Sequence, residues 1–223
     1  MALAQLGLFV RPPAEGSAKT RLAELLGDHG AAALYAAFVE DALRLCERVR
    51  AAGRVDITLW STGPNDETVS SWASRLGTTV RLQPQGDLGV KLGAAFEHGL
   101  QHYERIVIIG SDLPTLPIEL VASAFDALEL APLVLGPSND GGYYAVGATR
   151  RIRPSFNGVR WSTVHALRDT VEANASHRIA QIAPWYDIDE PQDLALLRAH
   201  LSVDESAAPS TARCLAELAG VQR

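Results

Sequence analysis

The segment from residue 105 to 115 sets the strongest limit on how this chain can fold. Four consecutive aliphatic residues, Ile106 to Ile109, form a short run that ends before a polar turn and Pro114. An unbroken aliphatic run of this length predicts a strand that is buried on both faces, as in a parallel sheet. Asp112 then follows the carboxyl end of that strand, where open α/β sheets bind their ligands. The alternative that Asp112 only caps the next helix or shapes a turn stays open.

Strand-like and helix-like segments alternate along the rest of the chain. The predicted strands cover residues 6–10, 55–60, 79–83, 106–109, 133–135, 143–148 and 179–182. The predicted helices begin near residues 17, 31, 64, 89, 117, 161 and 191, and a short one covers 211–218. Over roughly the first 135 residues the alternation has the spacing of βαβ units, which predicts an α/β fold with a mostly parallel sheet that is mixed at one edge. We expect residues 1–201 to form a single domain and residues 202–223 a C-terminal tail, mobile over 203–209, with a short helix.

The composition excludes several classes of protein. The formal net charge is −6, whereas a nucleic-acid partner usually requires a basic face, so we expect no such partner. An anionic small substrate is still allowed, because a local cationic cluster or a metal can hold it. No apolar run approaches the ~20 residues of a membrane span, and the first ten residues lack the features of a signal peptide. We therefore expect a cytoplasmic protein without a membrane span, and the oligomeric state stays open.

The first of five polar loops begins a helix with Gly16, Lys19 and Arg21. Free backbone N–H groups, the helix dipole and two cationic side chains together favour binding of an anion. The spacing matches neither the Walker motif nor the dinucleotide-binding glycine motif. A basic first turn exposed to solvent is the alternative, although cations in a first turn oppose the helix dipole.

Two further loops place glycines beside polar side chains, which allows the backbone to approach a ligand closely. One contains Gln83, Gly86, Asp87, Gly89 and Lys91, and the other contains Asp140, Gly141, Gly142 and Tyr143. The first loop can instead end in a simple helix cap at Asp87 or Gly89. The second can be an ordinary hairpin turn, since Asp-Gly is a strong hairpin signal.

The remaining two loops carry the acids that suggest a metal. A carboxylate at Asp112 can hold Mg²⁺ or Mn²⁺, which prefer oxygen ligands and often retain waters and substrate phosphates. Asp187 and Asp189 are two residues apart, so they lie on the same side of an extended segment and can point at the same ion. The sequence thus predicts a divalent metal held by Asp112, Asp187 and Asp189.

Six short motifs occur in a recognisable order. They are Phe9–Leu22, Gly86–Gly89, Gly110–Pro114, Leu135–Tyr144, Trp161–Thr163 and Asp187–Pro191. Together they resemble the DUF2064 family of bacterial glycosyltransferase-like proteins within the nucleotide-diphospho-sugar transferase (GT-A) superfamily. The chain is more distantly similar to the guanylyltransferases that activate phospholactate or phosphoenolpyruvate and to molybdenum-cofactor nucleotidyltransferases.

That resemblance implies a three-layer α/β/α, Rossmann-like GT-A fold, a nucleotide-activated donor and a divalent metal. By position, Asp112 matches the superfamily's metal aspartate, and Asp189 matches a second metal ligand. The residues that the resemblance places near the phosphates, the base or ribose, and the acceptor are Lys19 and Arg21, Gly86 to Gly89, and Gly141, Gly142 and Tyr143. The motifs add Arg11, Ser111 and Trp161 as candidates. Arg11 stands where lysine is usual and Lys91 where arginine is common, which changes the hydrogen-bonding geometry.

These observations predict a metal-dependent transferase with Asp112 and Asp140 as catalytic residues. Glycosyl transfer from a nucleotide sugar to a small acceptor is the first interpretation. The absence of an Asp-x-Asp motif at Asp112 favours an alternative, a nucleotidyltransferase that joins a nucleoside monophosphate from GTP or CTP to a phosphorylated small molecule and releases pyrophosphate. A third alternative is a nucleotide-binding module without catalytic activity.

Overall fold

The structure is a computed structural model that describes residues 3–16, 18–53, 55–63 and 66–221. In this part of the chain seven strands form one sheet in the order β3-β2-β1-β4-β6-β5-β7. They are β1 (Ala4–Val10), β2 (Val55–Ser61), β3 (Val80–Leu82), β4 (Arg105–Gly110), β5 (Leu133–Pro137), β6 (Tyr143–Thr149) and β7 (Ile179–Gln181). β6 runs antiparallel to β4 and β5, and the other neighbouring pairs are parallel. The prediction of an α/β fold with a mostly parallel, mixed sheet is confirmed.

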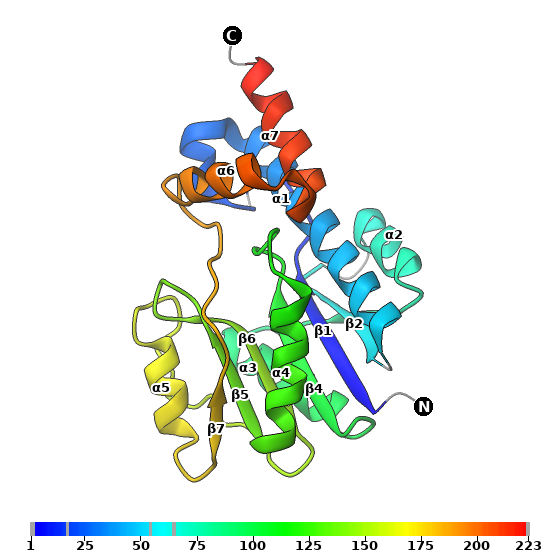
Figure 1. Cartoon of the computed structure of the whole chain (residues 1–223), viewed down its shortest axis with the longest axis vertical. Coiled ribbons are helices and arrows are strands. Elements are labelled where there is room, and N and C mark those ends of the chain that lie inside the picture. The colour runs from blue at the N-terminus through cyan, green and yellow to red at the C-terminus, as the bar shows by residue number, and fades with distance from the viewer. Residues whose placement is uncertain (1–2, 17, 54, 64–65, 222–223) are drawn as a thin grey trace.

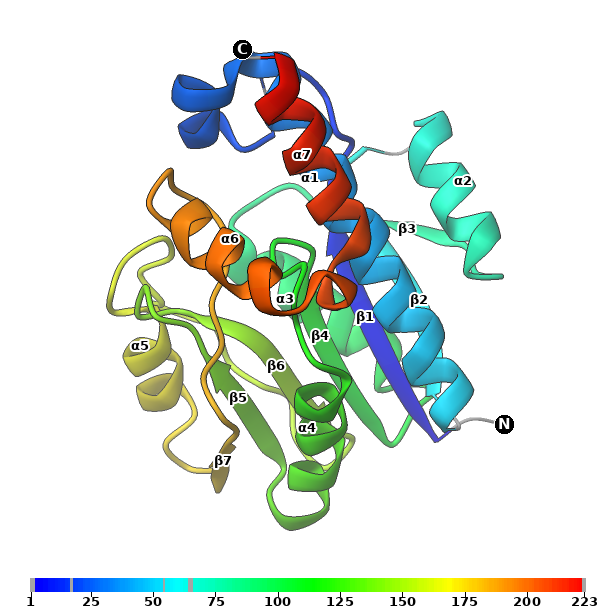
Figure 2. The ribbon, with the colours of Figure 1, turned by 45° about the horizontal axis from the view of Figure 1, so that its top comes forward.

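Helices cover both faces of this sheet (Figures 1 and 2). They are α1 (Thr20–Ala52), α2 (Glu67–Arg75), α3 (Leu88–Gly99), α4 (Ile118–Leu130), α5 (Ala166–Ala173), α6 (Asp193–Val203) and α7 (Pro209–Val221). Buried side chains of α1, α2, α4, α6 and α7 belong to one core cluster, and those of α3 belong to a second cluster. The architecture is therefore a three-layer α/β/α arrangement.

Strand β4 shows why the sheet is buried on both sides. Val107 and Ile109 belong to the first core cluster, whereas Ile106 and Ile108 belong to the second. Because successive side chains of a strand point to opposite faces, only an uninterrupted aliphatic run can fill both cores at once. The prediction made from residues 106–109 is confirmed.

Several helices differ from their predicted extents, α1 and α2 among them. The helices predicted from residues 17 and 31 form one element, α1, with a kink at Gly27, where φ is 71°. Glycine tolerates this conformation because it has no Cβ. The predicted helix start at residue 64 lies outside the described residues. α2 begins at Glu67, and the Asp66 side chain accepts a hydrogen bond from the Val69 N–H at 3.1 Å.

The C-terminal segment packs onto the body of the protein. Residues 203–209, which we expected to be mobile, contain a short 3₁₀ helix (Glu205–Ala207), and Ala208 is fully buried in the first core cluster. Asp41 of α1, which is only 4% exposed, accepts hydrogen bonds from the backbone N–H groups of Ser210 and Thr211 at 3.0 and 2.8 Å. The segment is thus packed and hydrogen-bonded, contrary to our expectation. Its polar composition does not reveal that Asp41 accepts from the first N–H groups of α7.

The five polar loops meet at one edge of the sheet. They follow β1, β3, β4, β5 and β7, which are parallel to one another, so their carboxyl ends point the same way. The helices in the described ranges do not combine the length and the apolarity that crossing a membrane demands.

Candidate active site

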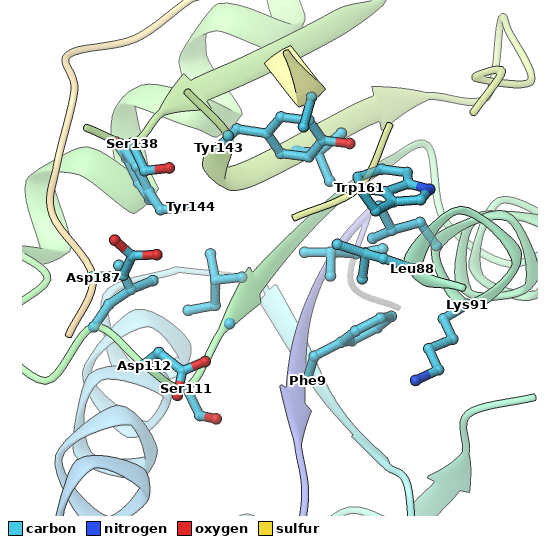
Figure 3. Close-up of a pocket in the computed structure, with 18 of the residues that line it drawn as sticks. Phe9, Leu88, Lys91, Ser111, Asp112, Ser138, Tyr143, Tyr144, Trp161 and Asp187 are labelled. Carbon is cyan, nitrogen blue, oxygen red and sulfur yellow. The ribbon is translucent and has the colours of Figure 1, made fainter. Parts of the chain in front are cut away.

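A cleft of about 460 Å³ opens at the carboxyl edge of the sheet. Figure 3 shows Asp112 and Asp187 on one side of it, with Leu88, Trp161 and Lys91 on the opposite side. One wall is thus acidic, and the other combines apolar surface with a cation. A ligand with a charged part and a flat apolar part matches this division.

Lys19 lies between two of the predicted metal ligands. Its ammonium nitrogen is 2.6 Å from Asp112 Oδ1 and 2.5 Å from Asp189 Oδ1. The Lys19 side chain is only 5% exposed, and its backbone is left-handed, with φ at 51°. Burial alone would lower the pKa of Lys19, but the Asp112 and Asp189 carboxylates outweigh burial and raise the pKa above its ordinary value. Asp112 and Asp189 therefore converge on one cationic group.

The chain segments that carry these acids are joined directly. The backbone N–H of Ile188 donates to the Asp112 carbonyl oxygen at 3.0 Å. Asp193, at the start of α6, accepts hydrogen bonds from the N–H groups of Asp189 and Glu190 at 2.9 and 2.7 Å. As an acid in the first turn of α6, Asp193 complements the helix dipole. Its carboxylate also holds the backbone of Asp189 in place.

A second support was not predicted from the sequence. The Tyr186 hydroxyl accepts a hydrogen bond from Thr115 at 2.8 Å and forms another with His200 Nδ1 at 2.6 Å. Thr115 follows Asp112 in the loop after β4, and His200 lies in α6. These bonds fix the segment that carries Asp187 against the loop after β4. The partners are far apart in the chain, so sequence spacing carried no signal for them.

Asp187 and Asp140 form the rest of the acidic wall. Burial, and then the charges of Asp189 and Asp140, raise the pKa of Asp187 to about 6. Asp140 Oδ1 accepts hydrogen bonds from the Ser138 hydroxyl and from the Gly142 N–H. The turn does connect the antiparallel strands β5 and β6. The hairpin alternative therefore holds, and the same turn lines the cleft.

Tyr35 of α1 is a further residue that the sequence reasoning missed. Its hydroxyl accepts a hydrogen bond from the Arg11 N–H at 3.0 Å and forms one with Ser111 Oγ at 2.9 Å. Burial and the nearby Asp112 charge raise the pKa of Tyr35 to about 12, so the hydroxyl keeps its proton. It joins the loops after β1 and β4. A tyrosine on the apolar face of a predicted helix was the available signal, because a buried hydroxyl needs a partner.

The predicted site residues divide into two groups. Those that line the cleft are Arg11, Gln83, Lys91, Ser111, Asp112, Asp140, Gly142, Tyr143, Trp161 and Asp187. Those outside its lining are Gly16, Lys19, Arg21, Gly86, Asp87, Gly89, Gly141 and Asp189. Asp87 caps α3 by accepting from the Val90 N–H at 2.9 Å, so the capping alternative holds there. Arg21 pairs with Glu190 at 3.0 Å.

Gly89 explains the position of Trp161. A Cβ atom at Gly89 would lie 3.0 Å from the Phe156 Cβ and 3.1 Å from Trp161 Nε1. Glycine at this position lets α3 pack this closely on the indole. The loop of Trp161 is clamped because Arg160 donates two side-chain hydrogen bonds, both at 2.8 Å, to Asp169.

The acidic wall has the donor chemistry that a hard divalent cation requires. Asp112, Asp187 and Asp189 offer only carboxylate oxygens, and burial, followed by the negative charges of Asp189 and Asp140, raises the pKa of Asp187. Among the described residues, no three acidic, histidine or cysteine side chains are already arranged around one ion position. Instead, Lys19 Nζ stands between Asp112 and Asp189. The residues fit a cation, and the metal site stays a prediction.

Comparison with known proteins identifies the family. The family model described as "Uncharacterized protein conserved in bacteria (DUF2064)" matches residues 45–163, which is more than half of the chain. The chain belongs to the DUF2064 family. A solved structure of a putative nucleotide-diphospho-sugar transferase from Desulfovibrio desulfuricans G20 is 30% identical to this DUF2064 protein, with a TM-score of 0.86. That match covers 97% of this chain and 95% of the other.

Two other proteins that are similar to this DUF2064 protein are informative. A 2-phospho-L-lactate guanylyltransferase from Methanopyrus kandleri is 36% identical over 90 residues. This match covers 39% of the chain and 46% of that protein, so the chain spans less than half of its length. The structure of Rv0371C from Mycobacterium tuberculosis H37Rv, in complex with manganese, is 16% identical with a TM-score of 0.50 and shares the fold. The match covers 88% of this chain and 98% of the Rv0371C chain. The Desulfovibrio and Methanopyrus proteins are both named as transferases, and this confirms the prediction of a transferase.

Proposed function

We propose that this DUF2064 protein is a metal-dependent transferase that binds a nucleotide-activated donor in the cleft and transfers part of it to a small acceptor. The observation that carries the proposal is the convergence of Asp112, Asp187 and Asp189, from loops far apart in the chain, beside a buried lysine. The similarity to the Desulfovibrio protein, over nearly the whole of both chains, supports the choice of a nucleotide-diphosphate donor.

Asp112, Asp187 and Asp189 would hold Mg²⁺ or Mn²⁺, since these ions favour carboxylate oxygens. A bound ion would supply electrostatic stabilisation of the charge that develops on the departing phosphate. The residues of the chain itself position the reacting groups, which accounts for much of the rate in phosphoryl-group chemistry.

The phosphates would lie where the cationic groups gather. The ammonium of Lys19 already contacts two carboxylates, and phosphate oxygens can replace one of these partners as anionic acceptors. Arg21 pairs with Glu190, but both side chains are well exposed, so this pair is weak and Arg21 can turn to a phosphate. Arg11 and Lys91 line the cleft and add positive charge.

Asp140 is our candidate for the group that removes a proton from the acceptor. Its Oδ1 atom is fixed by hydrogen bonds from Ser138 and Gly142, and no described residue donates to Oδ2. A carboxylate held in one orientation with a free oxygen can accept a proton from a nearby hydroxyl. Tyr143 and Trp161 would shape the acceptor side of the same cleft.

Glycosyl transfer from a nucleotide sugar is the first candidate reaction. Nucleotidyl transfer is the second, and one structural observation favours it: the acid that shares Lys19 with Asp112 is Asp189, from the segment after β7, and not a neighbour in an Asp-x-Asp pair. The partial similarity to a guanylyltransferase points the same way. The products separate the two reactions, because nucleotidyl transfer releases pyrophosphate from a nucleoside triphosphate whereas glycosyl transfer releases a nucleotide from a nucleotide sugar.

Calorimetric binding of a nucleotide with Mn²⁺ tests the proposal. Asp112→Ala should abolish metal-dependent nucleotide binding and lower the rate on the order of 10²-fold or more. Asp126→Ala, which removes an exposed acid from α4, is the matched control and should behave as wild type. An Asp112→Ala variant that binds metal and nucleotide like wild type refutes the assignment. Nucleotide binding without turnover across a broad donor and acceptor panel supports the non-catalytic alternative.

We also propose that residues 1–201 form the catalytic unit and that residues 202–223 support α1. The cytoplasmic location stays a prediction.

A further inference from the structure

Gln83 ties together the carboxyl ends of three strands. It follows β3, and its backbone N–H donates to the Ser61 carbonyl oxygen at 2.8 Å. Its side-chain nitrogen Nε2 donates to the carbonyl oxygens of Val10, at 3.2 Å, and Trp60, at 3.0 Å. The residue is 6% exposed, so this side chain is part of the cleft wall rather than a mobile surface group.

These contacts determine which way the amide faces. Carbonyl oxygens can only accept hydrogen bonds, so the nitrogen of the Gln83 amide must face Val10 and Trp60. Both amide hydrogens are then engaged, and the oxygen Oε1 faces away from the backbone. None of the described residues donates a hydrogen bond to Oε1.

The Gln83 oxygen is not closed off from the cleft. Among the described residues, the buried side-chain nitrogen and oxygen atoms without a partner are the indole nitrogens of Trp161 and Trp185, and Gln83 Oε1 is not one of them. Gln83 therefore presents one fixed acceptor to the ligand and no donor. A preorganised group of this kind discriminates strongly, because an analogue that lacks the matching donor leaves the acceptor unpaired.

The surroundings fit a flat ring that carries N–H groups. Leu88 is apolar yet 41% exposed, and Figure 3 shows it on the same side of the cleft as Phe9. Apolar walls beside one polar group are the usual arrangement of a pocket that binds a planar ligand. Lys91 lies on the same side in Figure 3 and adds a positive charge to this wall of the cleft.

Resting on the proposed function, we propose that Gln83 Oε1 selects donors whose nucleobase carries an exocyclic amino group. The amino group of cytosine can donate a hydrogen bond to Oε1. Uracil has a carbonyl oxygen at the same ring position, and this oxygen would repel Oε1. The residue is a specificity determinant and takes no part in bond making.

Two matched nucleotide pairs test this selection, with affinities measured by calorimetry in the presence of Mg²⁺. CTP and UTP differ in an amino group against a carbonyl at one ring position, and GTP and ITP differ by one amino group. Wild type should bind the amino-bearing member at least about tenfold more tightly in one pair or both. In Gln83→Met this ratio should fall to roughly threefold or less, since thioether sulfur is a weak acceptor.

Controls separate this effect from loss of structure. Gln85→Met makes the same chemical change at an exposed residue two positions away and should keep the wild-type ratio. Inorganic triphosphate should bind Gln83→Met and wild type equally, and melting curves report whether Gln83→Met folds.

The inference is overturned if wild type binds both members of each pair with equal affinity. This result is expected if Oε1 contacts a ribose hydroxyl, because both members carry the same ribose. It is also overturned if Gln83→Met retains the wild-type ratio. Should Gln83→Met fail to fold, the two pairs measured on wild type still decide. Binding of nucleotides without base discrimination overturns this inference alone, whereas failure of every nucleotide to bind overturns the proposed function as well.

Discussion

Replacing Lys19 by methionine removes the cation that stands between Asp112 and Asp189. Both carboxylate oxygens lie within 2.6 Å of the same nitrogen, so they are no more than about 5 Å apart. Two unit charges at that separation repel by about 3 kcal/mol when the effective dielectric constant is near 20. The Asp112 and Asp189 side chains are 33% and 48% exposed, so solvent screens part of this repulsion. We expect Lys19→Met to destabilise the protein by about 1–2 kcal/mol.

The assay is thermal unfolding with and without MnCl₂. For a chain of this length, 1 kcal/mol corresponds to about 2–4 °C, so Lys19→Met should melt about 2–8 °C below wild type without metal. Mn²⁺ should restore several degrees to the variant, because the cation then finds two carboxylates without a competing ammonium. Wild type should respond less to Mn²⁺ alone, since Lys19 occupies the space between the acids.

Arg21→Met is the matched control, because it removes a cation from the first turn of α1, two residues from Lys19. The pair of Arg21 with Glu190 is exposed and should contribute less than about 1 kcal/mol. If Lys19→Met melts like wild type and Mn²⁺ shifts both proteins equally, Lys19 does not hold the two acids together and the reasoning fails.

Two further predictions concern stability. The pKa of Asp187 is raised to about 6, so this group favours folding when protonated and its contribution is lost as the pH rises from about 4 to 6. In a chelator, Asp187→Asn should be more stable than wild type above pH 6 by about 1–2 kcal/mol and equal to it below pH 4; parallel pH profiles would contradict this. Asp41→Ala should cost about 2–3 kcal/mol in urea unfolding because the N–H groups of Ser210 and Thr211 lose their acceptor, and an unchanged midpoint would show that α7 is not docked.

Much of the fold followed from local pattern. The aliphatic run from Ile106 to Ile109 predicted a doubly buried strand, and its side chains do fill two separate cores. The alternation of strands and helices predicted a mostly parallel sheet, which brings the carboxyl ends of strands to one edge. The sequence alone therefore assigned Asp112 to the edge of the sheet at which the structure places the cleft.

Local pattern was less informative about single side chains in those loops. Gly89 was a candidate for ligand approach, but its place is set by the indole of Trp161, which packs on α3. Asp87 and Asp140 could each serve a turn or a ligand, and the turn contacts are present in both. A residue type allows several partners, and the neighbour that packs against it decides among them.

What the sequence by itself determined is the α/β class, the doubly buried central strand and the polar character of one sheet edge, because these depend on residues near one another in the chain. Only the tertiary structure decided that Lys19 meets Asp189, 170 residues away, and that Tyr35 joins two loops. It also decided that the side-chain nitrogen of Gln83 is held by two backbone carbonyl oxygens. Such contacts depend on the order of strands in the sheet and on which partners saturate each polar group. The spacing of residues along the chain reveals neither the strand order nor these partners.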